Sequence, residues 1–189
     1  GPDLPHRIPL TRRRGEGPAA DDFVARFNQL SAPLAAKAVE DTSFYRYVPV
    51  VELNEVGGDP TRPGRPTADL HTDLGHLAMR WPGTFVPLPP HDTKRGADVR
   101  ARLGRFSESE EAASALVAAI QRWHDRVADL APDPAFEWLL WQTIVGAWPI
   151  DLARLSTYAT KAMREAKAST SWLDPDEGYE QRVAIFMEA

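Results

Sequence analysis

The chain has 189 residues and a mass of 21.0 kDa, with 43% hydrophobic and 26% charged residues, which indicates one folded domain rather than a disordered chain. Its 22 basic and 27 acidic residues give a formal net charge of -5, so it has no general attraction for nucleic acid or an anionic membrane. The absence of cysteine excludes disulfides, thiolate zinc sites and cysteine nucleophiles, and no apolar run approaches the ~20 residues of a membrane-spanning helix.

The first 20 residues are rich in proline, glycine and arginine and predict a flexible tail, in which Gly1-Pro2 is typical of an expression scar. Since the start is not signal-like, we expect a cytoplasmic location. The first helix is predicted from Asp21-Asp22, where two acids precede apolar residues at helical spacing. Pro33 is expected to end or kink this helix.

Residues 41–66 begin with aromatic and β-branched side chains and continue into Gly57-Gly58-Asp59-Pro60. This pattern predicts a short extended segment followed by a long, ordered loop. A helix is predicted from about Ala68 to Arg80, where a Pro-Gly pair follows. The apolar run Thr84–Leu88 then predicts a buried strand that ends at Pro89-Pro90.

After Asp98 the pattern is almost entirely helical, and Ser107-Glu108-Ser109-Glu110 is a capping signal. The predicted helical segments are Val99–Leu103, Ala112–Leu130, Phe136–Trp148, Asp151–Lys167 and a last helix from Asp176. We expect the three long ones to pack as a small bundle with short, proline-containing turns. Four tryptophans have spacings that are typical of a helical core: Trp123, Trp138, Trp141 and Trp148.

His91-Asp92 follows the predicted strand, and ligands of α/β proteins bind at the carboxyl ends of strands. There the imidazole can donate to a sugar or another hydroxyl, and the carboxylate can accept from a neighbour. The structural alternative is that Asp92 caps a helix. Glu40-Asp41, with Lys37 one helical turn earlier, is open to the same two interpretations.

The remaining acidic residues and histidines do not predict a metal or cofactor site. Glu55 and Asp59 flank a diglycine without EF-hand spacing, so a structural turn is favoured there. His71 and His76 are five residues apart, which is not the i,i+4 spacing of a zinc pair. The GxGxxG, P-loop and GxSxG motifs are absent. We therefore expect neither a metal nor a cofactor.

Five blocks of sequence, in the same order, resemble maltooligosyltrehalose synthase. They are Lys37–Tyr47, Leu53–Pro60, His91–Arg102, Trp141–Pro149 and Lys161–Glu180. The resemblance implies the α-amylase superfamily, whose catalytic domain is a (β/α)8 barrel with helical insertions. It also implies conversion of the reducing-end α-1,4 link of a maltooligosaccharide into an α,α-1,1 link, by a retaining mechanism that uses three carboxylates.

The resemblance implies roles for individual residues. Asp92 matches the third carboxylate, which grips sugar hydroxyls, and His91 matches the neighbouring sugar-binding histidine; these are the candidate catalytic residues. The candidate substrate-binding residues are Lys37, Glu40, Asp41, Tyr45, Lys94 and Arg95. The nucleophile and general acid of the family come from barrel strands outside the matched blocks. Ala38 and Pro89-Pro90 depart from the family pattern and stiffen the backbone near this site.

The fold class that we expect is mainly α: about eight helices, with two or three short strands derived from an incomplete (β/α)8 barrel. Two of these strands are expected near Ala35–Val39 and at Thr84–Leu88. Residues 21–189 are expected to form one mostly helical domain, with a barrel-derived part over 21–105 and a helical part over 106–189.

Three functions remain open. In the first, the chain is a partial maltooligosyltrehalose synthase that is not competent for the reaction alone. In the second, it is a freestanding truncated relative that binds a small molecule or uses His91 and Asp92 in acid/base chemistry. Alternatively, it is a non-catalytic helical scaffold that pairs through exposed strand edges or apolar helix faces, and then a homodimer is a candidate assembly. The expected partner is a small-molecule or oligosaccharide ligand, with no nucleic acid and no membrane.

Overall fold

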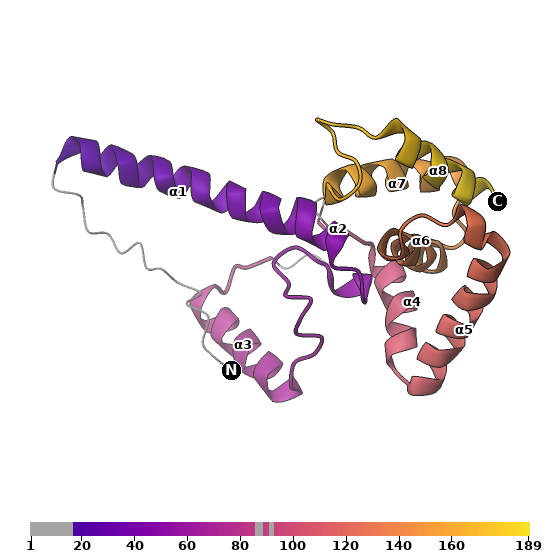
Figure 1. The fold of residues 1–189 in the computed structure, drawn as a ribbon. Coiled ribbons are helices and arrows are strands. Elements are labelled where there is room, and N and C mark those ends of the chain that lie inside the picture. Colours follow the sequence, from indigo (N-terminus) through magenta and orange to yellow (C-terminus); the bar gives the residue numbers. More distant parts are fainter. Residues whose placement is uncertain (1–16, 86–88, 91–92) are drawn as a thin grey trace. The chain divides into compact units, whose positions relative to one another are not determined.

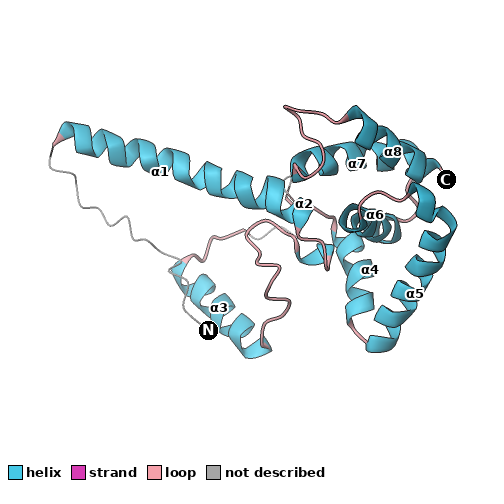
Figure 2. Ribbon diagram, in the orientation of Figure 1, coloured by secondary structure: helices cyan, strands magenta, loops and turns pink. Residues whose placement is uncertain are grey.

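A computed structural model describes residues 17–85, 89–90 and 93–189. Over these residues the chain is mainly helical, with eight α-helices and no strand (Figure 2). Two compact units are present, one ending at Val39 and one covering Glu40–Ala189, and each is described by itself. In the described part of the chain, every helix is too short or too polar to cross a membrane.

Helix α1 (Pro18–Ala38) belongs to the first unit. It begins at Pro18 rather than at Asp21, because the fixed φ of proline suits the first position of a helix. Pro33 lies inside α1 and does not end it. The strand predicted near Ala35–Val39 is wrong: the first four of these residues complete α1, since alanine and lysine are strong helix formers. Val39 then begins a π-helical turn, Val39–Ser43.

The extended segment predicted after Asp41 is also wrong, because the chain forms the short helix α2 (Phe44–Arg46) and then a 3-10 turn (Val51–Leu53). The buried side chain of Asn54 holds the two pieces together. Its Nδ2 donates to the carbonyl oxygens of Phe44 and Tyr47 at 2.8 and 2.6 Å. The local chain reversal is thus stabilised by a side-chain amide rather than by pairing with a strand.

A second buried amide fixes the same segment to the helix that follows much later in the chain. The backbone N–H of Val51 donates to Gln142 Oε1 at 3.0 Å, and Gln142 Nε2 donates to the carbonyl of Val48 at 2.9 Å. Since an unpaired buried polar group costs about 1–3 kcal/mol, these bonds fix the register between the loop and the helix.

Helix α3 (Thr67–Arg80) forms within one residue of the predicted bounds. The strand predicted at Thr84–Leu88 is not seen where the chain is described: Thr84 and Phe85 have no regular secondary structure, and residues 86–88 lie outside the described ranges.

Five helices form the bundle of the second unit (Figure 1). They are α4 (Ala97–Ser107), α5 (Glu110–Val127), α6 (Pro134–Ala147), α7 (Leu152–Ala166) and α8 (Glu177–Glu188). The predicted turn Val99–Leu103 is therefore part of a full helix, and α5 continues into a 3-10 turn, Ala128–Leu130. Four of these helices have side-chain N-caps, from Ser109, Asp133, Asp151 and Asp176, each accepting from an N–H of the first turn.

The core of the bundle is centred on α6, where Leu139 and Leu140 are completely buried. Helix α4 approaches α6 closely at Gly146, since a Cβ there would lie 2.8 Å from Val99 Cγ1. Arg46 of α2 reaches the end of α7, where its guanidinium donates to the carbonyls of Ala166 and Lys167. A remote side chain thereby satisfies carbonyls that the helix itself leaves unpaired.

Candidate functional site

The predicted catalytic residues, His91 and Asp92, lie outside the residues that the structure describes. Lys37 lies on α1, in the first unit. The other predicted residues belong to the second unit: Glu40, Asp41, Tyr45, Lys94 and Arg95. Glu40 and Asp41 share the π-helical turn, and Tyr45 lies on α2 immediately after it.

Lys94 and Asp41 form a partly buried ion pair. Lys94 Nζ lies 2.9 Å from Asp41 Oδ1, and the two side chains are 13% and 22% exposed. The backbone N–H of Lys94 also donates to Glu55 Oε1 at 3.2 Å. Because a partly buried pair is screened less than a surface pair, this contact fixes the segment that follows His91-Asp92 against the π-helical turn.

Arg95 and Tyr45 extend the site towards α7. Arg95 Nη2 donates to the hydroxyl oxygen of Tyr158 at 3.1 Å. The pKa of the Tyr45 phenol is raised to about 12, chiefly because the side chain is buried. Tyr158 and the carboxylates of Asp41 and Glu165 contribute to this rise, and the charge of Arg95 opposes it. Tyr45 is therefore neutral at physiological pH and serves as a packed, uncharged wall rather than as a base.

We call Asp41, Tyr45, Glu55, Lys94, Arg95 and Tyr158 the rim cluster. It places two cations, two carboxylates and two phenols in one region, a mixture of hydrogen-bond donors and acceptors that suits a polyhydroxylated ligand. Glu55 Oε2 and Thr93 Oγ1 are buried and have no hydrogen-bond partner among the described residues. Over those same residues, no three histidine or carboxylate side chains converge as metal ligands would.

Sequence reasoning missed two members of the rim cluster. Glu55 was assigned only to a turn, and that turn does form: Gly57 has a φ of +73°, and the N–H of Gly58 donates to the carbonyl of Glu55 at 2.8 Å. Its side chain nevertheless accepts from Lys94. Tyr158 lies within the predicted helix Asp151–Lys167 and was not a candidate residue. It is 63 residues from Arg95 in the chain, so no local pattern could reveal their contact.

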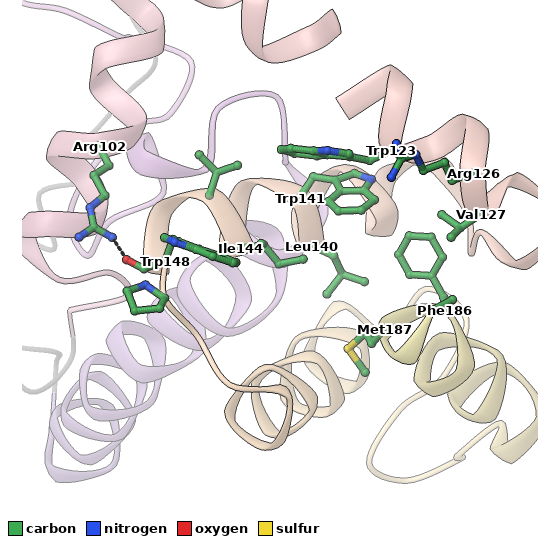
Figure 3. Close-up of a pocket in the computed structure, with 13 residues that line it drawn as sticks. Arg102, Trp123, Arg126, Val127, Leu140, Trp141, Ile144, Trp148, Phe186 and Met187 are labelled. Carbon is green, nitrogen blue, oxygen red and sulfur yellow. Dashed lines mark hydrogen bonds between the residues drawn. The ribbon is translucent and has the colours of Figure 1, made fainter. Parts of the chain in front are cut away.

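A separate apolar pocket, which we call the aromatic pocket, lies among α4, α5, α6 and α8 and has a volume of about 940 Å³ (Figure 3). It corrects the prediction that all four helical tryptophans are core residues. Trp148 is 64% exposed and Trp123 is 36% exposed, and both line the pocket together with Trp141. Their helical spacing was compatible with a groove as well as with a core.

Comparisons with known proteins match this chain to one part of several longer proteins. No family model matches the chain. A Mycobacterium tuberculosis protein assigned as a maltooligosyl trehalose synthase is 40% identical over 177 residues, which is 90% of this chain and 22% of that protein. Among solved structures, the maltooligosyltrehalose synthase from Arthrobacter ramosus is 39% identical with a TM-score of 0.77, over 91% of this chain and 22% of that one.

The DSM5389 glycosyltrehalose synthase is also similar, with 30% identity and a TM-score of 0.78 over 89% of this chain and 23% of that one. The chain thus spans less than a quarter of the length of the relatives that it matches.

Proposed function

Because the chain is a partial match to the maltooligosyltrehalose synthase family, we propose that it provides part of a maltooligosaccharide-binding cleft and does not complete the reaction alone. In this proposal Asp92 and His91 contact sugar hydroxyls. A retaining transglycosylation also needs a carboxylate nucleophile and a carboxylic acid. The family blocks in this chain carry one of the three carboxylates, so binding without turnover is the expected behaviour.

The observation that carries this proposal is the ion pair between Lys94 and Asp41. It joins two blocks of family resemblance, Lys37–Tyr47 and His91–Arg102, across 53 residues of chain. Those blocks hold the candidate residues, and the rim cluster is where they meet. A sugar needs closely spaced donors and acceptors on a fixed framework, which the cluster supplies.

The residues of the rim cluster have different roles in the proposed binding of a sugar. Lys94 and Arg95 donate to sugar oxygens, whereas Asp41 and Glu55 accept from sugar hydroxyls. Tyr45 is too buried to stack on a sugar ring, so it positions Arg95 and the π-helical turn instead. Within the described ranges, Glu55 Oε2 and Thr93 Oγ1 are buried without a hydrogen-bond partner, and both residues lie close in the chain to residues of the cleft.

Calorimetric titration of the chain with maltopentaose tests the proposal. We expect saturable binding, no trehalose-terminated product, and a loss of affinity of about tenfold in Asp92→Asn and in Lys94→Met. Arg105→Gln is the matched control, because Arg105 is an exposed cation on α4 outside the cluster. Absence of binding would refute the assignment of a carbohydrate site. Formation of a trehalose-terminated product would refute the proposal that the chain cannot complete the reaction alone.

A second candidate function, self-association, is supported by α1 alone. Its apolar side chains recur at spacings of four, three and four residues, which is the pattern of pairing helices. They are Phe23, Phe27, Leu30 and Leu34, with exposures of 67, 46, 61 and 59%. Sedimentation velocity should then show a dimer that Leu30→Glu dissociates and Gln29→Glu does not. A monomer at every concentration would exclude this candidate.

A further inference from the structure

The aromatic pocket has a rigid apolar wall. Glu137 is buried, and its Oε1 accepts from the indole N–H of Trp141 at 2.9 Å and lies 2.9 Å from His124 Nδ1. The ring of Trp141 packs against Trp123 at a centroid distance of 5.2 Å and against Phe186 at 5.8 Å. Because the indole N–H is satisfied within the protein, the Trp141 ring is held in place before any ligand arrives.

The floor and the far wall of the pocket come from one face of α6 and the residue that follows it. Leu140, Ile144 and Trp148 are spaced four residues apart and therefore share a helix face (Figure 3). The backbone at Trp148 is held by Arg102, whose Nη1 donates to the carbonyl of Trp148 and, at 3.3 Å, to that of Gly146. A volume of about 940 Å³ with apolar walls is typical of a site for a small organic molecule.

The charges at the pocket select the kind of molecule. Arg126 lines it beside Trp123, and its guanidinium forms no ion pair or hydrogen bond within the described part of the chain (Figure 3). Among those residues, no aspartate or glutamate side chain lines the pocket. The charged side chains that line the pocket are therefore those of Arg102 and Arg126, and both are cations. Their charge favours an anionic ligand.

Aromatic walls by themselves would also suit a quaternary ammonium ion, which is attracted to the faces of indole rings. Here two guanidinium groups disfavour any cation through like-charge repulsion. The apolar walls in turn require that the ligand carry a hydrocarbon or aromatic body, since a small hydrated anion gains nothing from them.

We propose that the aromatic pocket binds an amphiphilic anion: a molecule with an apolar body that lies on Trp123, Trp141 and Trp148 and one acidic group that pairs with Arg126. This site is separate from the rim cluster and independent of the proposed carbohydrate function. Because the wall is fixed in advance, little ordering of side chains opposes binding.

Three ligands that share one tail test the charge preference: octanoate, 1-octanol and octyltrimethylammonium. Calorimetry should show that octanoate binds more tightly than octanol by up to about fivefold, as an exposed ion pair provides, and that the ammonium binds most weakly. Arg126→Gln should abolish the difference between octanoate and octanol. Arg122→Gln, which changes an exposed arginine of α5 outside the pocket, should preserve it.

The place of binding is tested by the indole N–H resonances of the chain. Octanoate should shift those of Trp123, Trp141 and Trp148 and leave those of Trp81 and Trp172 unchanged. Trp148→Ala should weaken all three ligands, and its exposed side chain makes this variant safe for folding. The proposal is overturned by equal affinities for octanoate and octanol, by the absence of saturation, or by self-association of the chain that excludes the ligand from the pocket.

Discussion

Arg164 and Glu180 form a two-pronged ion pair that joins α7 to α8. Arg164 Nε lies 2.8 Å from Glu180 Oε1 and its Nη2 lies 2.7 Å from Oε2, and Thr170 Oγ1 donates to Oε1 at 2.7 Å. These hydrogen bonds, chiefly those from Arg164, hold the pKa of Glu180 below its ordinary value of 4.5. The last helix of the bundle is therefore held in part by a carboxylate that must stay ionised.

Removing that charge should destabilise the bundle in a pH-dependent way. Glu180→Gln is expected to lower the melting temperature by several degrees at pH 7. Because the folded-state pKa is depressed, this stabilisation is present above about pH 4.5 and is lost as the pH falls through the folded-state pKa. Melting curves of both proteins between pH 7 and pH 3 should converge at the acid end, and a constant difference would contradict the assignment.

Gly146 should tolerate no side chain, because α4 lies against it. A methyl group there would lie 2.8 Å from Val99 Cγ1 and 3.3 Å from Leu103 Cγ, so Gly146→Ala must push α4 away from α6. We expect a loss of about 1–3 kcal/mol in the free energy of unfolding, measured with urea.

Gly75 provides the matched control for this substitution. It lies within α3, and a Cβ there would meet no atom within 4 Å. Gly75→Ala should leave stability unchanged or raise it by about 0.5–1 kcal/mol, since alanine is the better helix former. If both variants lost stability equally, the close approach of α4 and α6 would not be the cause.

The phenol of Tyr45 should limit stability at alkaline pH. Its pKa is raised from 10.0 to about 12, chiefly by burial, so the folded state resists the ionisation that the unfolded chain undergoes. The stability that this provides is present below pH 10 and is lost as the pH rises from 10 to about 12. Tyr45→Phe should flatten that part of the stability profile, whereas Tyr47→Phe, at an exposed tyrosine, should not.

The last three helices were the part of the fold that could be predicted best. They were expected at Phe136–Trp148, at Asp151–Lys167 and from Asp176, and they form within about two residues of those bounds as α6, α7 and α8. The signals for these helices are local, since each helix is also capped by an aspartate immediately before it. The resemblance to maltooligosyltrehalose synthase is confirmed as a partial match. The strand near Ala35–Val39 was expected from the barrel that the resemblance implies, and it was wrong because the alanine-rich sequence there favours a helix.

The contacts within the rim cluster could not be predicted from the sequence. The resemblance supplied Asp41 and Lys94 as separate candidates, yet it did not show that they pair, because 53 residues separate them. No sequence pattern marked Tyr158 as a site residue, since a single tyrosine on an amphipathic helix does not reveal what its hydroxyl contacts. Contacts between distant segments depend on packing that no local pattern encodes.

The contact of Arg46 with the end of α7 links the local opening of that helix end to the detachment of α2. The carbonyls of Ala166 and Lys167 are bonded by a guanidinium from α2, so the last turn of α7 cannot fray while α2 stays docked. Amide protons in that turn should then exchange with deuterium at the rate at which α2 detaches. Their exchange rate therefore measures the detachment of α2, a segment about 120 residues earlier in the chain.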